Sequence, residues 1–199
     1  MMFYKFSIIS SLLFLTLFAK WTFGQNDKGP ETNVVYGEKY IFTIETPYGW
    51  INDKDLAHKI GLVCLFYPEE EKVETNKNYF YANGIDKKTS EESLTNFIND
   101  DIEHFRKKYP DLTFKKIPVE ISGGLRNGVV YSYSNLTDNY KVEVLYAETD
   151  DSFLTFSFAS KTLEDYKTYQ PVFDQFIASF IYRGNNPKPF LDYMKNQKK

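Results

Sequence analysis

Alternation of apolar and polar positions along the chain predicts a series of β-strands. The clearest case runs from Lys39 to Glu45, where Tyr40, Phe42 and Ile44 form one apolar side of a half-buried strand. The segment from Thr46 to Trp50 contains a proline and a glycine, which end the strand in a turn. Further strands are predicted at Leu62 to Tyr67, Tyr79 to Ile85, within Phe114 to Ile121, and at Val129 to Ser134, Tyr140 to Ala147 and Phe153 to Ser160.

The connectors predict how these strands pair. The segments Asn135 to Asn139 and Thr149 to Ser152 are short and rich in turn formers, which favours antiparallel pairing of neighbours. Several strands are apolar on both sides, because Val130, Leu145 and Phe153 alternate with other apolar residues. Helices are therefore expected on both faces of the sheet. The predicted fold class is α+β, with a mostly antiparallel sheet of about six or seven strands flanked by helices as an α/β/α sandwich.

Two helices are predicted by apolar residues that recur every three or four positions. The first begins at Thr89 or Ser90, because Thr89 and Glu92 have the spacing of a capping box, and it ends at Pro110. Its apolar stripe consists of Leu94, Phe97, Ile98, Ile102 and Phe105. The second is capped by Thr162, and Pro171 either kinks it or restarts it as a first-turn proline. Its stripe consists of Tyr166, Tyr169, Phe173, Phe176, Ile177 and Phe180. A short helical turn is expected within residues 53–61.

The first residues have the pattern of an export signal. Lys5 precedes an apolar run from Phe6 to Phe18, and Thr22 and Gly24 offer small side chains for cleavage. The run is shorter than the roughly 20 apolar residues that span a bilayer, and no second run follows it. We therefore predict export to the periplasm or the extracellular space after cleavage near Gly24, with no membrane span in the mature chain. The expected organisation is a signal peptide at 1–24, a flexible lead-in at 25–38, a single α+β domain at 39–182 and a loosely ordered tail at 183–199.

Charge and cysteine content narrow the possible partners. The 199 residues include 24 lysines and arginines against 27 acidic residues, a net charge of −3. Lys5 and Lys20 belong to the leader, so 22 basic residues remain against 27, a net charge of −5. We expect no nucleic-acid partner, because binding nucleic acid needs a basic face.

The lone Cys64 lies in an apolar stretch and is predicted to be a buried core residue. No cysteine ends the leader, so no lipid anchor is expected.

Few residue patterns in the sequence indicate a catalytic or metal-binding site. The two histidines, His58 and His104, have no histidine or cysteine at metal-ligand spacing, although His58 lies near two aspartates. No G-x-S-x-G nucleophile motif occurs. Acidic runs at 69–71, 100–101 and 150–151 are interpreted as solvated loops or a wet helix face, because acid/base work needs one desolvated carboxylate. We predict no catalytic, metal-binding or cofactor-binding residue, no cofactor and no enzymatic activity.

Aromatic residues are abundant, with 16 tyrosines and 18 phenylalanines. Most belong to the predicted core stripes. Rings left at a sheet edge would form a flat amphipathic surface of the kind that interfaces and carbohydrate or lipid grooves use. The candidate surface for a partner or ligand consists of Tyr48, Trp50, His58, Tyr79 and Tyr81.

Several motifs resemble a known family. They are Phe42-x-Ile44 before Pro47-x-Gly49-Trp50, the central amphipathic helix, the meander from Val129 to Ser160, and Tyr169-x-Pro171-x-Phe173 before Ser179-Phe180. This set resembles the PsbP-like superfamily, which includes the bacterial DcrB proteins and a yeast Ran-binding transport factor, and the resemblance covers Tyr40 to Phe180. It implies an antiparallel sheet between helices and an accessory or partner-binding role without catalysis. No partner-specific motif carries over.

Two functions follow as hypotheses. The first is an exported, non-catalytic accessory module that binds an unidentified protein partner in the bacterial cell envelope. The alternative is a binder of a small or lipid-like ligand in a groove between sheet and helix, which requires a concave apolar pocket with a few convergent polar groups. An enzyme of unrecognised type requires His58 beside a carboxylate in a cleft.

Overall fold

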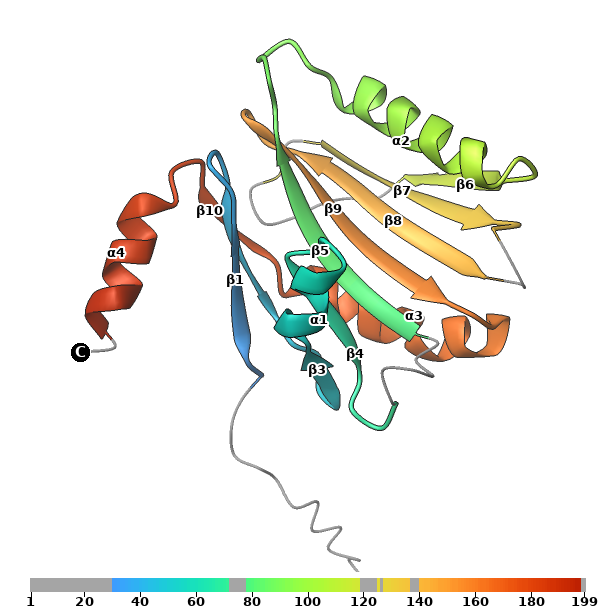
Figure 1. Cartoon of the computed structure of the whole chain (residues 1–199), viewed down its shortest axis with the longest axis horizontal. Helices are drawn as coiled ribbons and strands as arrows, with labels where there is room; N and C mark the ends of the chain where they lie inside the picture. Colours follow the sequence, from blue (N-terminus) through green and yellow to red (C-terminus); the bar gives the residue numbers. More distant parts are fainter. Residues whose placement is uncertain (1–29, 72–77, 119–124, 126, 137–139, 198–199) are drawn as a thin grey trace, which may run out of the picture.

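The computed structural model describes residues 30–71, 78–118, 125, 127–136 and 140–197 (Figure 1). In these parts the chain forms ten strands and four helices. In chain order they are β1 (Thr32–Tyr36), β2 (Ile41–Glu45), β3 (Trp50–Asn52), α1 (Lys54–Lys59), β4 (Cys64–Pro68), β5 (Asn78–Asp86), α2 (Leu94–Lys108), β6 (Thr113–Pro118), β7 (Asn127–Ser134), β8 (Lys141–Glu148), β9 (Ser152–Ser160), α3 (Leu163–Ala178), β10 (Ile181–Gly184) and α4 (Lys188–Gln197). The predicted leader lies outside the described residues.

The strands form two sheets. The main sheet has seven strands in the order β3-β4-β5-β9-β8-β7-β6, and each neighbouring pair is antiparallel. The short connectors after β7 and β8 join adjacent strands, as their turn-forming residues predict. The predicted α+β class with a mostly antiparallel sheet is confirmed. One difference is that β2, expected in the same sheet, pairs instead with β1 and β10 in a separate sheet of three strands.

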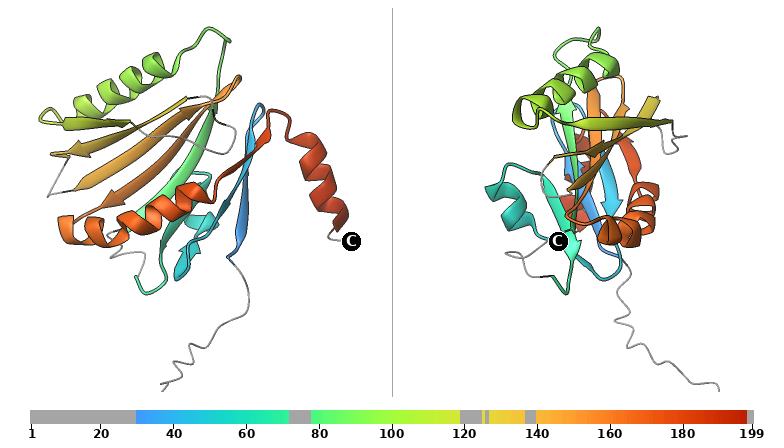
Figure 2. Two further views of the ribbon diagram at one scale, coloured as in Figure 1. Left: turned by 180° about the vertical axis from the view of Figure 1, so that it is seen from behind. Right: turned by 90° about the vertical axis from the view of Figure 1, so that its right-hand side faces the viewer.

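Helices cover both faces of the main sheet, because its strands carry apolar residues on both sides (Figure 2). On one face α3 and the small sheet enclose a core rich in phenylalanine, where Phe80 lies 5.1 Å from Phe173 and 5.0 Å from Phe158 between ring centroids. On the opposite face α2 covers β7, β8 and β9, and α1 covers β4. The right-hand panel of Figure 2 shows α1 and α2 on one side and α3 on the other.

Helix α2 has the predicted apolar stripe but begins later than predicted. Leu94, Ile98 and Ile102 are buried against the sheet, and Phe97 and Phe105 pack beside them. The N-cap is Ser93, whose Oγ accepts a hydrogen bond from the backbone N–H of Asn96 at 3.2 Å. The capping box predicted at Thr89 and Glu92 is therefore wrong. The Glu92 carboxylate accepts the backbone N–H of Lys88 instead, in the turn before the helix.

Helix α3 is continuous through its proline. Thr162 caps it as predicted, since its Oγ1 accepts the backbone N–H of Asp165 at 3.0 Å. Pro171 lies inside the helix, well past its first turn, so the helix does not restart there. Phe173 and Phe176 are the fully buried members of its stripe. Cys64 is buried in β4 as predicted.

Both ends of the chain are more regular than predicted. Residues 32–36 of the expected lead-in form β1, which pairs with β2 along its whole length. Residues 181–184 form β10 on the other side of β2, and α4 follows in the segment expected as a loose tail. Strand β10 depends on pairing with a distant part of the chain, which local patterns do not encode, whereas β1 pairs with the next strand along the chain. No helix within the described ranges is long and apolar enough to cross a membrane.

The small sheet meets the main sheet around Tyr40. Its ring lies between Gly37 and Gly84, where a Cβ atom would come within 2.3 Å of ring Cε1 and 2.4 Å of ring Cζ, respectively. The hydroxyl donates a hydrogen bond to the carbonyl of Gly84 at 3.0 Å. Burial, with the charge of Asp86 as a smaller cause, raises the pKa of Tyr40 to about 12. Glycine is required at both positions because only its backbone leaves room for the ring.

Candidate functional site

An open groove of about 540 Å³ lies between α2 and the adjoining ends of β5 and β9. Three apolar side chains line it: Ile85, Phe97 and Phe153. Four acidic side chains also line it: Asp86, Glu92, Asp100 and Asp101. Lys88 and His104 are the basic residues at this lining. The groove therefore combines a small apolar part with an acidic rim.

The spacing of residues along α2 explains which side chains face the groove. Phe97 lies one position before the buried Ile98, and Asp101 follows Phe97 by four residues, so both lie at the border of the apolar stripe. Phe97 stacks on Phe153 of β9 with ring centroids 4.6 Å apart. His104 is exposed one turn further along the helix. This border of α2 forms one wall of the groove, and the sheet forms the other.

Asp101 joins a chain of buried hydroxyl groups. The hydroxyl of Tyr146 donates a short hydrogen bond to the Asp101 carboxylate, and it lies 2.9 Å from the hydroxyl of Tyr133. Burial raises the pKa of Asp101, while the bond from Tyr146 and the charge of His104 partly oppose that shift. Burial also raises the pKa of both tyrosines. The two phenols therefore stay protonated, and Asp101 holds a proton more readily than an exposed aspartate.

The lining of the groove offers acidic side chains, and its one serine is already engaged. That serine is Ser93, whose Oγ caps α2. Nucleophilic catalysis needs a hydroxyl or thiol next to a base that can activate it. Among the described residues, no three His, Cys, Asp or Glu side chains lie together in a way that could hold a metal ion. The acidic rim can attract positively charged groups.

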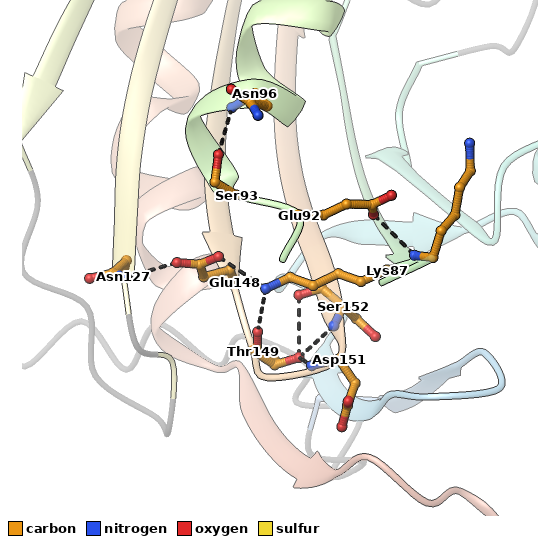
Figure 3. Close-up of polar contacts among 10 residues, drawn as sticks. Lys87, Glu92, Ser93, Asn96, Asn127, Glu148, Thr149, Asp151 and Ser152 are labelled. Atoms are coloured by element: carbon orange, nitrogen blue, oxygen red, sulfur yellow. Dashed lines mark hydrogen bonds and ion pairs between the residues drawn. The ribbon is translucent and has the colours of Figure 1, made fainter. Parts of the chain in front are cut away.

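A buried ion pair fixes the end of α2 that borders the groove (Figure 3). The ammonium of Lys87 lies 3.1 Å from the Glu148 carboxylate, donates to the carbonyl of Thr149 at 3.1 Å, and sits 4.8 Å from the centre of the Phe153 ring. The Glu148 carboxylate also accepts from the amide of Asn127 at 2.8 Å. These contacts join β5, β7 and β8 directly before the first turn of α2.

The same carboxylate satisfies the start of the helix. Burial alone would raise the pKa of Glu148, but hydrogen bonds from Asn127, Lys87 and the backbone N–H of Leu94 lower it overall. Leu94 is the first residue of α2, so its N–H is one of the donors that a helix start leaves without an internal partner. The Glu148 carboxylate thus lies near the N-terminus of α2, where a negative charge is favourable.

A second buried acid lies on the opposite face of the main sheet. Glu143 of β8 accepts a short hydrogen bond from the hydroxyl of Tyr166 on α3. Burial raises its pKa, and hydrogen bonds from Tyr166 and Gln170 partly oppose the shift. Oε1 of Gln170 is buried with no hydrogen-bond partner among the described residues. This acid is covered by α3 and does not belong to the groove.

Trp50 is a core residue, which corrects its assignment to the candidate surface. It is 7% exposed and stacks on Phe80 with ring centroids 4.0 Å apart, on the α3 face of the sheet. Tyr169 of α3 meets the ring edge-on at 5.3 Å. Tyr48, two residues earlier, is 90% exposed, and His58 on α1 is also exposed.

Tyr79 and Tyr81 lie on the other face of the sheet, with α1 and α2. Both are half-buried, and their rings stack with centroids 6.4 Å apart. The hydroxyl of Tyr140 donates to that of Tyr79 at 2.6 Å, and burial raises the pKa of both Tyr79 and Tyr81. The five residues predicted as a surface therefore do not lie together, because the ring of Trp50 faces the opposite core.

The groove residues were missed because they come from distant segments. Asp100 and Asp101 were interpreted as a wet helix face, whereas Asp101 is half-buried and bonded to Tyr146. The position of Asp101, three residues after Ile98 at the edge of the apolar stripe, was the available signal. Phe153 was predicted to be an apolar residue of its strand, but its stacking on Phe97 depends on how α2 crosses the sheet.

Comparison with known proteins identifies the fold. No protein-family model and no curated protein match the sequence. The solution structure of cyanobacterial PsbP (CyanoP) from Synechocystis sp. PCC 6803 is similar, with a TM-score of 0.51 and 14% identity over 78% of this chain and 94% of that chain. The fold is PsbP-like.

Two other solved structures are similar at lower TM-scores. A Pseudomonas aeruginosa protein described as a putative regulator has a TM-score of 0.45 at 13% identity, over 73% of this chain and 92% of that one. The Saccharomyces cerevisiae Ran-binding protein Mog1p has a TM-score of 0.43 at 14% identity, over 76% and 95%. The PsbP-like resemblance predicted from the sequence is confirmed for the fold, and the narrower likeness to DcrB proteins stays a prediction.

Proposed function

We propose that this chain is an exported, non-catalytic accessory module that binds a protein partner in the bacterial cell envelope, and that the groove beside α2 is its binding surface. The observation that carries the proposal is the open groove of about 540 Å³ with four acidic side chains around a small apolar part. Charged rims around an apolar centre are typical of surfaces that recognise polypeptides. The leader pattern of the sequence supports export.

The lining of the groove favours a polypeptide over a lipid-like ligand. Small-molecule pockets are lined predominantly by apolar and aromatic side chains and enclose most of their ligand. Here three of the eleven lining residues are apolar, and the groove is open to solvent. A basic side chain flanked by an apolar one fits this composition better than an acyl chain does.

A binder of a small molecule is the second candidate. One observation favours it: the groove lies between the sheet and a helix, which is the kind of position that the alternative hypothesis expects for a ligand site. Its volume is within the range of small-molecule sites, roughly 300 to 1,000 Å³. A ligand of this class would need amine groups to meet the acidic rim.

Photocrosslinking in the native envelope tests the proposal. A photoreactive residue placed at Asn96, which is exposed at the groove, is expected to attach a protein, because the groove is the proposed contact. The matched control carries the same group at Lys167, an exposed position of α3 on the other face. Adducts from both positions alike, or from neither, would contradict the proposal. Recovery of a small amine from the Asn96 variant would favour the second candidate.

Export has a separate test. The mature N-terminus of the protein from fractionated cells is expected near residue 25, as the leader predicts. Recovery of the uncleaved chain from the cytoplasm would contradict export without bearing on the groove.

A further inference from the structure

Helix α4 stands apart from the two sheets (Figures 1 and 2). In the described part of the chain, α4 makes no extensive contact with another helix or strand. Its sequence is amphipathic, because four of its ten residues form one apolar side: Phe190, Leu191, Tyr193 and Met194. Tyr193 is 59% exposed. A ten-residue helix is marginal in water on its own, so such a helix gains stability by docking its apolar side.

The charges of α4 are opposite to those of the groove. Helix α4 itself has Lys188, Lys195 and Asp192, which is 2 − 1 = +1 in side-chain charge, and Lys188 is paired with Asp192 at 2.7 Å. Lys198 and Lys199 follow the helix in the sequence, so residues 188–199 carry +3. The groove has four acidic residues and Lys88, which is 1 − 4 = −3 with His104 neutral. Charges of opposite sign steer association and help to select the partner.

The dimensions of the two features also agree. The ten residues of α4 span about 15 Å at 1.5 Å per residue. The wall of the groove formed by α2 runs from Ser93 to His104, twelve residues or about 18 Å by the same rise, so it is long enough to take α4. If α4 docked there, its apolar side would meet the exposed parts of Phe97 and Ile85, and its lysines would meet the acidic rim.

We propose that α4 of one molecule docks in the acidic groove of a second copy of this chain. The inference rests on the groove as the binding surface proposed above, and it names one partner for it. A second copy is favoured over the same molecule because the exit of α4 is held in place. The amide of Asn185 donates to the Asp151 carboxylate at 2.7 Å, and Pro187 and Pro189 restrict the backbone that follows.

Sedimentation of the protein purified from its own cells tests this contact. Association that increases with protein concentration and weakens at high salt is expected, because charge complementarity contributes to it. Lys195→Glu on α4 and Asp100→Lys in the groove, both at exposed positions, should each raise the dissociation constant about tenfold or more. The matched control, Lys167→Glu on α3, should leave it unchanged.

Mixing the two charge-reversed variants gives the sharpest result. In the mixture, α4 with Lys195→Glu is more acidic and the groove with Asp100→Lys is more basic. Their charges are again complementary, so association between the two variants is expected to return. A protein that stays monomeric at all concentrations, or an association that both variants leave unchanged, would overturn the inference. Crosslinks between Asn96 and Lys195 within one monomer would also overturn it, because α4 would then close on its own groove. If association fails while the envelope adducts at Asn96 persist, only this inference is lost and the proposed function stands.

Discussion

The ion pair between Lys87 and Glu148 allows a quantitative test of how α2 is held. Lys87→Met keeps most of the apolar stem of the side chain but removes the ammonium group. The side chains of the pair are 7% and 17% exposed, so water replaces little of what is lost. Removing one partner of a buried ion pair costs about 3 to 5 kcal/mol in general. Glu148 keeps the donors of Asn127 and Leu94, so we expect a loss of about 2 to 3 kcal/mol in the free energy of unfolding.

Equilibrium unfolding in urea, followed by circular dichroism, measures this loss as a lower midpoint at an unchanged slope. The matched control is Lys54→Met, which removes the exposed pair with Glu31 and should leave the midpoint unchanged. The double variant of Lys87→Met with Glu148→Gln should recover part of the loss, since no unpaired charge remains. A midpoint for Lys87→Met equal to that of the control would refute the view that this pair anchors the helix.

Three further predictions concern single buried positions. Gly84→Ala should lower the free energy of unfolding by about 2 kcal/mol, because the new Cβ atom clashes with the ring of Tyr40. In a Tyr40→Leu background the same change should be nearly neutral. Urea midpoints of the single and double variants measure both effects. Cys64 should react with a thiol reagent at pH 8 at least about 100-fold more slowly in the folded protein than in urea, because burial raises its pKa to about 11; equal rates would contradict its burial. For Glu143 the folded pKa is raised, so the carboxyl group stabilises the fold below the ordinary value near 4.5 and that contribution is lost as pH rises. At pH 7.5 the Glu143→Gln variant should therefore be as stable as the natural protein or more stable, and near pH 4 the difference should vanish. Thermal unfolding at the two pH values measures this. A variant that is more destabilised at pH 7.5 than at pH 4 would contradict a raised pKa for Glu143.

Periodicity predicted the elements that form the layers. The stripe around Ile98 and the alternation in β7, β8 and β9 place apolar residues where α2 and the sheet bury them. The apolar residues on both sides of these strands, such as Leu145, correctly required cover on both faces. The apolar stripe of a helix and the alternation of a strand depend only on residues within the same element, so they can be recognised from the sequence.

The start of α2 shows where local patterns fail. The sequence pattern predicts a start at Thr89 or Ser90, but Ser93 is an equally good N-cap residue, so residue preference alone does not choose among the three. Tertiary contacts help to decide among them, because the ion pair between Lys87 and Glu148 holds the segment just before Ser93, the residue that caps the helix. That pair joins residues 61 positions apart, and no local spacing encodes it.

The burial of Trp50 and the existence of the groove have the same kind of cause. Trp50 follows a turn-forming segment, which favoured an exposed position, but the pairing of β3 with β4 brings its ring onto Phe80. The groove needs Asp101 from α2 and Phe153 from β9 to meet across the sheet. Long-range packing creates both features, so they become visible only when the strand order is known.

The outermost strands of the main sheet have a consequence for aggregation. β3 is three residues long, so a foreign strand finds few ladder positions there. β6, at the other border, exposes Lys115 and Lys116, and a strand that added to it would dehydrate two ammonium groups. The sheet is thus a poor template for fibril growth, although the chain is rich in aromatic rings.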